Sequence, residues 1–193
     1  MGYVMLGIAA AAATLPAGAN LVSKATALNG ATLQMVNHGI ITGALFFLVG
    51  VLYDRAHLRD LDAFGGLAKQ VPVYAGLMMF ACFASLGLPG LAGFISEFLV
   101  FLGAFGSAGL TYQIITGISL LGVVLTAAMF LWMIQRVFLG ELNPRWAGLK
   151  DMDGGELFAI IPLAALTLAI GVYPMPILNL INGAMTHILA LIR

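Results

Sequence analysis

Long apolar runs separated by short polar segments dominate the chain. At about 1.5 Å per residue, a helix needs about 20 apolar residues to cross a hydrocarbon core of about 30 Å. Several runs exceed about 18 residues, and they lack the apolar–polar alternation of transmembrane β-strands. The pattern predicts an all-α membrane protein, a polytopic transmembrane helix bundle forming one domain over residues 1–193.

Polar segments set the predicted boundaries of the helices. They fall at residues 16–29, 54–70 and 140–155, and a short uncharged turn falls at 107–110. The predicted helices cover residues 1–15, 30–53, 72–86, 94–106, 111–138 and 156–172, with a tail helix over 177–192. The tail either continues the last span or lies at the membrane interface.

The apolar stretch over residues 71–105 is too long for one straight span, since it would extend roughly 52 Å. Its middle holds Gly87, Pro89, Gly90 and Gly93. Proline removes a backbone donor and disfavours the helical conformation of the preceding residue, and glycine opens further conformations. We therefore expect one discontinuous span made of two half-helices.

Composition excludes several classes of function. Hydrophobic residues make up 62% of the chain and charged residues 8%, against about 25% charged in soluble domains. The formal net charge is zero, so nothing points to nucleic acid. The single Cys82 and three scattered histidines offer no disulfide and no spacing for a metal, haem or iron–sulfur site. We expect a protein surrounded by lipid that binds no cofactor or metal itself.

The distribution of Lys and Arg indicates the topology. If the broken span crosses the membrane once, the loops at 54–70 and 136–155 share a side and hold three basic residues each, leaving only Lys24 and Arg193 elsewhere. The positive-inside rule then makes both loops cytoplasmic. A re-entrant hairpin would separate the two loops, so a single crossing is favoured.

Glu97, which follows Ser96 just past the predicted break, is the first candidate for chemistry. An ionisable side chain within a span is costly and suggests function. Loss of water favours the neutral carboxyl, whereas the nearby helix N-terminus favours the anion by only roughly 0.3–2 kcal/mol. We expect a carboxyl that takes up and releases a proton. The alternative is a structural carboxyl that bonds the frayed backbone.

A polar stripe runs along the predicted helix over residues 30–53. Gln34, His38 and Thr42 recur at every fourth residue, with Asn37 alongside. A helix facing lipid would not tolerate this stripe, so we expect it to face the protein interior. The alternative for His38 is a neutral imidazole that hydrogen-bonds a neighbouring helix.

A second polar face lies on the predicted helix over residues 111–138. It consists of Tyr112, Thr116, Ser119 and Thr126. These side chains could order a file of water molecules, and they are equally typical of ordinary helix–helix packing.

Segments 34–39, 44–55, 65–67 and 84–98 resemble the antiporter-like subunits of respiratory complex I, most closely the subunit M (chain 4) group of NADH:quinone oxidoreductase. Sister subunits and related cation/proton antiporter subunits usually carry lysine at the position of Glu97. The family is longer, with two inverted repeats, and this chain resembles its C-terminal portion.

The resemblance implies a function and residue roles. Glu97 would be the terminal proton site of a translocation channel and His38 a proton relay, with Gln34, Asn37, Thr42, Ser96, Thr116 and Ser119 as a supporting polar path. The chain would belong to a proton-translocating subunit of the oxidoreductase in the bacterial inner membrane, beside sister antiporter-like subunits. NADH, FMN, iron–sulfur clusters and quinone would be bound by other subunits.

Two alternatives stay open at this point. One is a subunit of a multi-subunit sodium/proton antiporter, against which the glutamate at position 97 argues. The other is a structural or non-functional truncated fragment.

Overall fold

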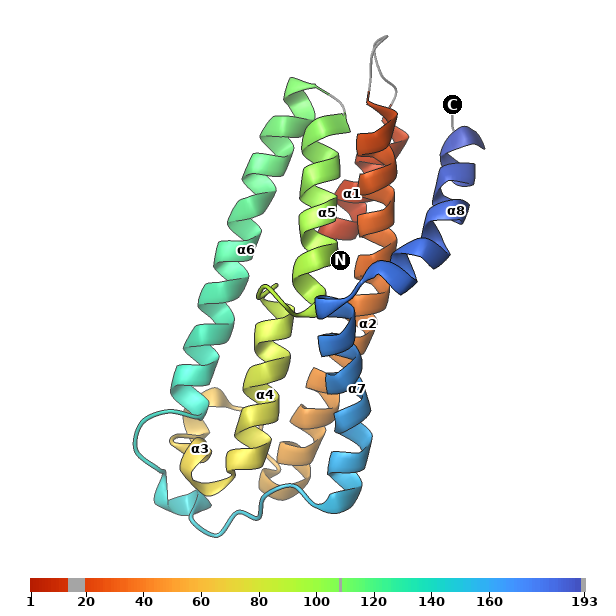
Figure 1. Ribbon diagram of the computed structural model, residues 1–193. Helices are drawn as coiled ribbons and strands as arrows, with labels where there is room; N and C mark the ends of the chain where they lie inside the picture. Colours follow the sequence, from red (N-terminus) through yellow and green to blue (C-terminus); the bar gives the residue numbers. More distant parts are fainter. Residues whose placement is uncertain (14–19, 108, 192–193) are drawn as a thin grey trace.

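The computed structural model describes residues 1–13, 20–107 and 109–191 (Figure 1). Its helices are α1 (Gly2–Ala12), α2 (Leu21–Ala56), α3 (Leu67–Gln70), α4 (Pro72–Ser85), α5 (Ala92–Ser107), α6 (Leu110–Val137), α7 (Gly154–Val172) and α8 (Met175–Leu191). Short 3-10 helices occur at Leu61–Ala63 and Pro144–Trp146, and the described ranges hold no strand. The predicted all-α fold is confirmed.

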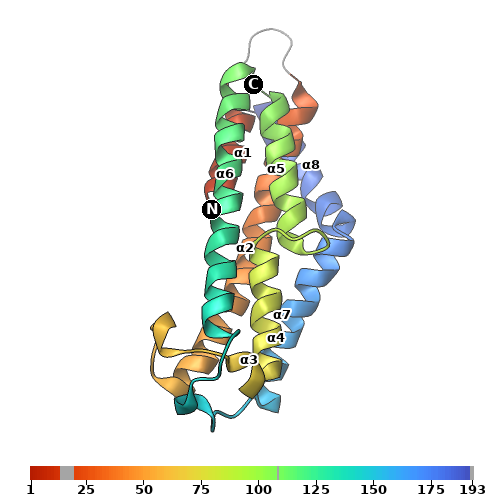
Figure 2. The same cartoon turned by 90° about the vertical axis from the view of Figure 1, so that its left-hand side faces the viewer.

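One crossing of the bundle is discontinuous, as predicted. Helices α2, α6 and α7 are each long and apolar enough to cross a membrane. By contrast, α4 and α5 have 14 and 16 residues, or about 21 and 24 Å, and neither spans a core of about 30 Å. They stack end to end beside α2 in both views (Figures 1 and 2).

The predicted start of the second helix at residue 30 is wrong. Helix α2 begins at Leu21, where the Asn20 side chain caps it by accepting a hydrogen bond from Val22 N at 3.1 Å. The predicted turn over 16–29 is therefore helical from residue 21, while residues 14–19 lie outside the described residues. Polar residues that suggested a turn instead join helices, since Asn29 Nδ2 donates to Asn182 Oδ1 of α8 at 2.7 Å.

The tail helix extends beyond α7 along α2. Helix α8 starts two residues before its predicted position, after the Tyr173–Pro174 interruption, and lies beside the half of α2 that α7 does not cover (Figure 1). Besides the contact between the two asparagines, Thr32 Oγ1 of α2 lies 3.1 Å from Met185 Sδ. Polar contacts with α2 thus hold α8 against the bundle.

Hydrogen bonds between the two basic loops place both at one end of the molecule. Gly66 N donates to Leu139 O at 3.2 Å, and Asn143 N donates to Gly65 O at 3.1 Å. Gly66 has a φ of 63°, a conformation that glycine adopts at little cost. The single crossing of the broken span, predicted from the positions of the basic residues, is therefore confirmed.

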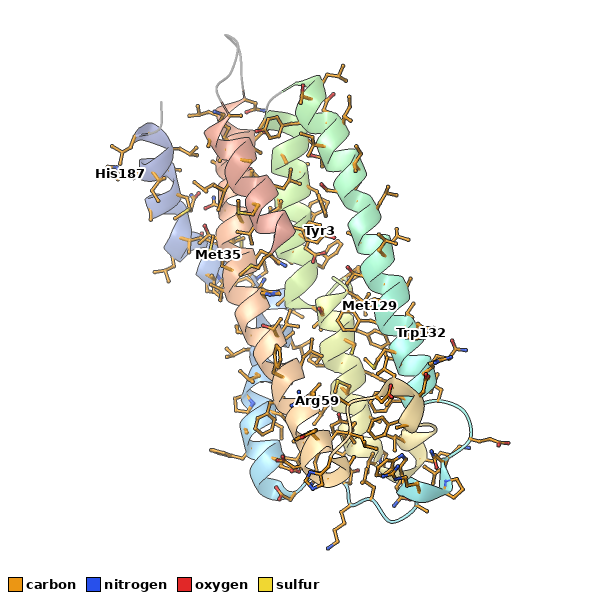
Figure 3. All side chains as sticks on the ribbon, turned by 180° about the vertical axis from the view of Figure 1, so that it is seen from behind. Tyr3, Met35, Arg59, Met129, Trp132 and His187 are labelled. Atoms are coloured by element: carbon orange, nitrogen blue, oxygen red, sulfur yellow. The ribbon has the colours of Figure 1, made fainter. Side chains whose placement is uncertain are left out.

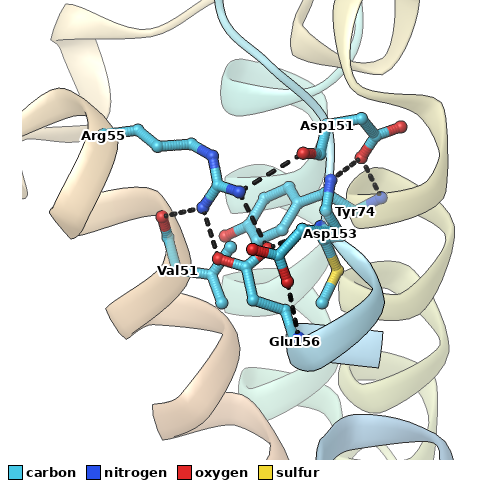
Figure 4. A network of polar contacts seen from close by, with 7 residues as sticks. Val51, Arg55, Tyr74, Asp151, Asp153 and Glu156 are labelled. Atoms are coloured by element: carbon cyan, nitrogen blue, oxygen red, sulfur yellow. Dashed lines mark hydrogen bonds and ion pairs between the residues drawn. The ribbon is translucent and has the colours of Figure 1, made fainter. Parts of the chain in front are cut away.

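A network around Arg55 ties together three helix ends near these loops (Figure 4). The Arg55 guanidinium donates to both carboxylate oxygens of Glu156, at 2.7 and 2.8 Å, and to Asp151 O at 3.3 Å. The Asp151 carboxylate accepts from Val73 N and Tyr74 N, at 2.9 and 3.0 Å, and so caps α4. The ends of α2, α4 and α7 are consequently fixed relative to one another.

The partly buried Arg55–Glu156 pair should contribute more stability than the exposed pair between Arg136 and Asp62. Side-chain exposure is 20% and 21% in the first pair and 47% and 72% in the second. We expect Glu156→Gln to lower the unfolding free energy by about 1.5–3 kcal/mol, and Asp62→Asn by less than about 1 kcal/mol. Thermal unfolding of both variants in the same detergent tests this, and equal losses would contradict it.

Candidate functional site

A cavity of about 190 Å³ lies at the level of the break between α4 and α5. It has room for roughly six water molecules, at about 30 Å³ each. Residues from α1, α2, α4, α5, α6 and the break form its wall: Met1, Tyr3, Gln34, His38, Ile41, Ala84, Ser85, Leu86, Gly93, Glu97, Val123 and Thr126. Glu97 and His38, both singled out from the sequence, face this one cavity.

Several backbone N–H groups of the break donate to carbonyls of the break itself or of the last turn of α4. Leu88 N donates to Phe83 O at 3.1 Å and Gly87 N donates to Ala84 O at 3.3 Å, which is the Schellman pattern of a helix end. The pattern requires a left-handed residue, and Gly87 has a φ of 74°. Leu91 N then donates to Leu88 O at 3.0 Å, close to the start of α5.

The four break residues predicted from the sequence act in different ways. Gly87 and Gly90 have positive φ values of 74° and 93°, and Pro89 has no N–H that would need an acceptor. Gly93 lies so close to the Ala84 carbonyl that a Cβ at this position would clash with it. Glycine at 93 therefore lets the start of α5 approach the end of α4.

Glu97 is almost buried, with 9% of its surface exposed. Its carboxyl lies beside Gly87, where an added Cβ would stand 2.7 Å from Glu97 Oε2. The two ion pairs of the described residues lie near the basic loops and do not involve Glu97. A carboxyl at this position has its polar atoms beside the cavity and is able to bind water or exchange a proton there.

Only part of the predicted polar stripe of α2 lies in the cavity wall. Gln34 and His38 line the cavity, whereas Thr42 does not. The Thr42 hydroxyl donates to the His38 carbonyl of its own helix at 2.5 Å. The expected continuation of the stripe to Thr42 is therefore not seen in the cavity wall.

Asn37 faces α5 rather than the cavity. Its Nδ2 donates to Ala92 O at 2.7 Å and to Ser96 Oγ at 3.1 Å, and the Ser96 hydroxyl in turn donates to Gln34 Oε1. Asn37 and Ser96 are fully buried. This chain of contacts fixes the first turn of α5, and with it Glu97, against α2.

The polar face of α6 reaches the cavity only through Thr126. Thr116 and Ser119 lie outside the cavity wall, although the sequence suggested them as part of the path. The Thr116 hydroxyl is buried without a hydrogen-bond partner in the described part of the chain. Tyr112 donates to Ala9 O at 3.0 Å and thereby joins α6 to α1.

Sequence reasoning did not identify Tyr3 and Ser85 as cavity residues. Tyr3 extends from α1 toward α5 and α6 (Figure 3). It is one polar group in a short apolar helix, so no periodic pattern marks it. Ser85 is the last residue of α4, and only the position of the helix end brings it to the cavity.

Relatives with a similar sequence include subunits of NADH-quinone oxidoreductase. It is 41% identical over 192 residues to NADH-quinone oxidoreductase subunit M of Rhodobacter capsulatus, covering 97% of this chain and 34% of that protein. The subunit M of Mycobacterium tuberculosis is 40% identical over 82% of this chain and 28% of its own length. The chain thus spans about a third of the length of these relatives.

Solved structures share the fold. Respiratory complex I from Thermus thermophilus contains a chain with a TM-score of 0.80 and 29% identity, matched over 97% of this chain and 37% of its own. The Mrp complex from a Dietzia species gives a TM-score of 0.73 at 19% identity, over 96% of this chain and 40% of its own. At that identity the likeness to the Mrp complex shows the fold alone.

A family comparison matches residues 1–126, which is more than half of the chain. The matched family is described as NADH:quinone oxidoreductase/Mrp antiporter, transmembrane. The discontinuous span and the cavity beside it both include residues of the matched region. This chain therefore belongs to the NADH:quinone oxidoreductase/Mrp antiporter transmembrane family.

Proposed function

We propose that this chain belongs to a proton-translocating membrane-arm subunit of NADH:quinone oxidoreductase, which moves protons while electrons pass through other subunits. One observation carries the proposal: a nearly buried carboxyl, Glu97, and an imidazole, His38, face the same cavity where a membrane span is interrupted. The relatives named subunit M, at about 40% identity, support the same assignment.

The energetics of a buried carboxyl suit such a role. Moving one charge through about 100 mV takes about 2.3 kcal/mol. Removing an ion from water costs several kcal/mol in a protein interior, so small changes in hydration or nearby charge can switch Glu97 between its neutral and charged forms. Proton uptake and release at Glu97 would thus respond to movements of the surrounding helices.

His38 and the α2–α5 contacts would have separate tasks. An imidazole exchanges protons near neutral pH and can pass them through cavity water to Glu97. Asn37 and Ser96 would hold Glu97 at a fixed height relative to His38, because their hydrogen bonds join α2 to the first turn of α5.

The remaining assignments follow from this role. The loops at 54–70 and 136–155 would face the cytoplasm of a bacterium, since they hold six basic residues at one end of the bundle. Sister antiporter-like subunits and lipid would cover the exposed apolar side chains of α6, such as Leu121, Val124 and Leu125. NADH, FMN, iron–sulfur clusters and quinone would bind other subunits.

A second candidate is a subunit of a sodium/proton antiporter, which the fold shared with the Mrp complex favours. The two differ in the coupling ion. Proton transport that requires sodium in reconstituted vesicles would support the antiporter, and sodium-independent transport driven by NADH would support the first proposal.

Glu97→Gln should strongly reduce proton pumping in the assembled complex. The amide keeps the size of the side chain but cannot exchange a proton. We expect the initial rate of NADH-driven acidification of vesicles to fall about a hundredfold or more, from the low end of the range ascribed to one positioned proton-transfer group upward. Glu141→Gln, at an exposed carboxyl, is the matched control. Unchanged pumping in Glu97→Gln, or a defect only in assembly, would favour a structural role.

His38→Gln should slow the supply of protons to Glu97 without removing the acceptor. Water in the cavity can replace part of the relay, so we expect a smaller loss than in Glu97→Gln, about three- to tenfold. Added imidazole should restore part of the rate. His187→Gln, on the exposed side of α8, should pump normally; an equal loss in both histidine variants would refute the relay.

A further inference from the structure

Tyr3 stands on one side of Glu97, away from the basic loops. Helix α5 runs from the break toward the opposite end of the bundle (Figure 1). Phe101 lies one turn beyond Glu97 in that direction, and the Tyr3 ring packs edge-on against it with 5.0 Å between ring centroids. Because Tyr3 also lines the cavity, it occupies the boundary between the cavity and the end with few basic residues.

The hydroxyl of Tyr3 fits a gap on α6. A Cβ added to Gly122 would stand 3.0 Å from Tyr3 Oη and have no nearer neighbour. Gly122 lies four residues before the cavity residue Thr126, or about 6 Å along the helix axis. The phenol therefore brings a hydroxyl to a level of α6 that has no polar side chain of its own.

Beyond this level, α6 supplies further hydroxyls. Ser119 and Thr116 follow at intervals of three residues toward the start of the helix, on the face that carries Gly122 and Thr126. The Thr116 hydroxyl has no hydrogen-bond partner in the described residues, although only 2% of its residue surface is exposed. A buried hydroxyl normally has a partner, and its partner is often a bound water.

We propose that the Tyr3 hydroxyl, seated against Gly122, passes protons between Glu97 and the α6 hydroxyls on the side of the membrane opposite the basic loops. This inference rests on the proposed function of Glu97. Thr126, Tyr3, Ser119 and Thr116 would lie along about 15 Å of α6, and water would fill the intervals. Tyr3 and Thr126 both line the cavity, and Tyr3 is the step from which protons would pass on to Ser119.

The transfer leaves Tyr3 chemically unchanged. The phenol oxygen accepts a proton from Glu97 through water while its own O–H bond breaks and that proton moves to the next oxygen. One O–H bond forms at the phenol as another breaks, Glu97 becomes a carboxylate, and Tyr3 remains neutral. No oxidant, reductant or co-substrate takes part.

Two variants of the assembled complex in vesicles test the path. Tyr3→Phe removes only the hydroxyl, and Gly122→Val fills the space that the hydroxyl occupies. We expect each to lower NADH-driven proton transport about tenfold and to raise its solvent deuterium isotope effect, while the KM for NADH and quinone stays unchanged.

Matched controls separate proton transfer from packing. Tyr112→Phe removes a tyrosine hydroxyl that bonds a backbone carbonyl. Gly117→Val adds the same side chain to α6 where no atom lies within 4 Å of the new Cβ. Both should transport protons at the normal rate. Losses in the controls equal to those in the test variants would overturn the inference, because packing would then explain them.

The result of Glu97→Gln distinguishes the two proposals. If Glu97→Gln loses transport while Tyr3→Phe and Gly122→Val keep the normal rate and isotope effect, the Tyr3 path is wrong and the role of Glu97 stands. If none of the three variants loses transport, the proposed function fails and the Tyr3 path fails with it.

Discussion

A chain that stops being helical inside a membrane must still satisfy its backbone polar groups, and this constraint organises the whole bundle. The six residues between α4 and α5 do so largely by bonding to one another and to the last turn of α4. Neighbouring helices then pack directly on the exposed backbone: Gly171 of α7 lies so close to Gly90 and Leu91 that a Cβ there would clash with them. The interruption therefore packs on α7 at Gly90 and Leu91, while Leu88 and Pro89 are exposed.

The same packing positions the chemical groups. Gly87 has no side chain, and the space that a Cβ would need is taken by the Glu97 carboxyl. Where α5 faces α2, Gly103 meets the Ala27 backbone and Gly30 meets Val100 N, so α2 and α5 approach more closely than larger residues would permit. The Arg55 network fixes the distant ends of α2, α4 and α7. Glu97 is thus held in place by the contacts between α2 and α5 and by the Arg55 network, although the span that carries it is divided into two half-helices.

Much of this arrangement could be predicted from the sequence, because the thickness of the hydrocarbon core limits the length of a membrane-spanning helix and the residues that it can contain. An apolar stretch too long for one span, with glycines and a proline at its middle, predicts the break and the carboxyl beside it. The start of α2 was predicted wrongly because Lys24 and Asn29 resemble loop residues, although they serve helix contacts here. Tyr3 could not be found, since its partner in space, Gly122, is 119 positions away and is distinguished only by the side chain it lacks.

Helix geometry explains why Gln34 and His38 reach the cavity and Thr42 does not. With about 100° of rotation per residue, each step of four residues advances about 40° around the axis, so Thr42 lies about 80° from Gln34, whereas Ile41 lies within about 20° of it. Ile41 accordingly lines the cavity. Asn37 lies about 100° from His38, and its two hydrogen bonds to α5 fix the rotation of α2 about its axis. The direction of the His38 side chain therefore depends on an amide that itself faces away from the cavity.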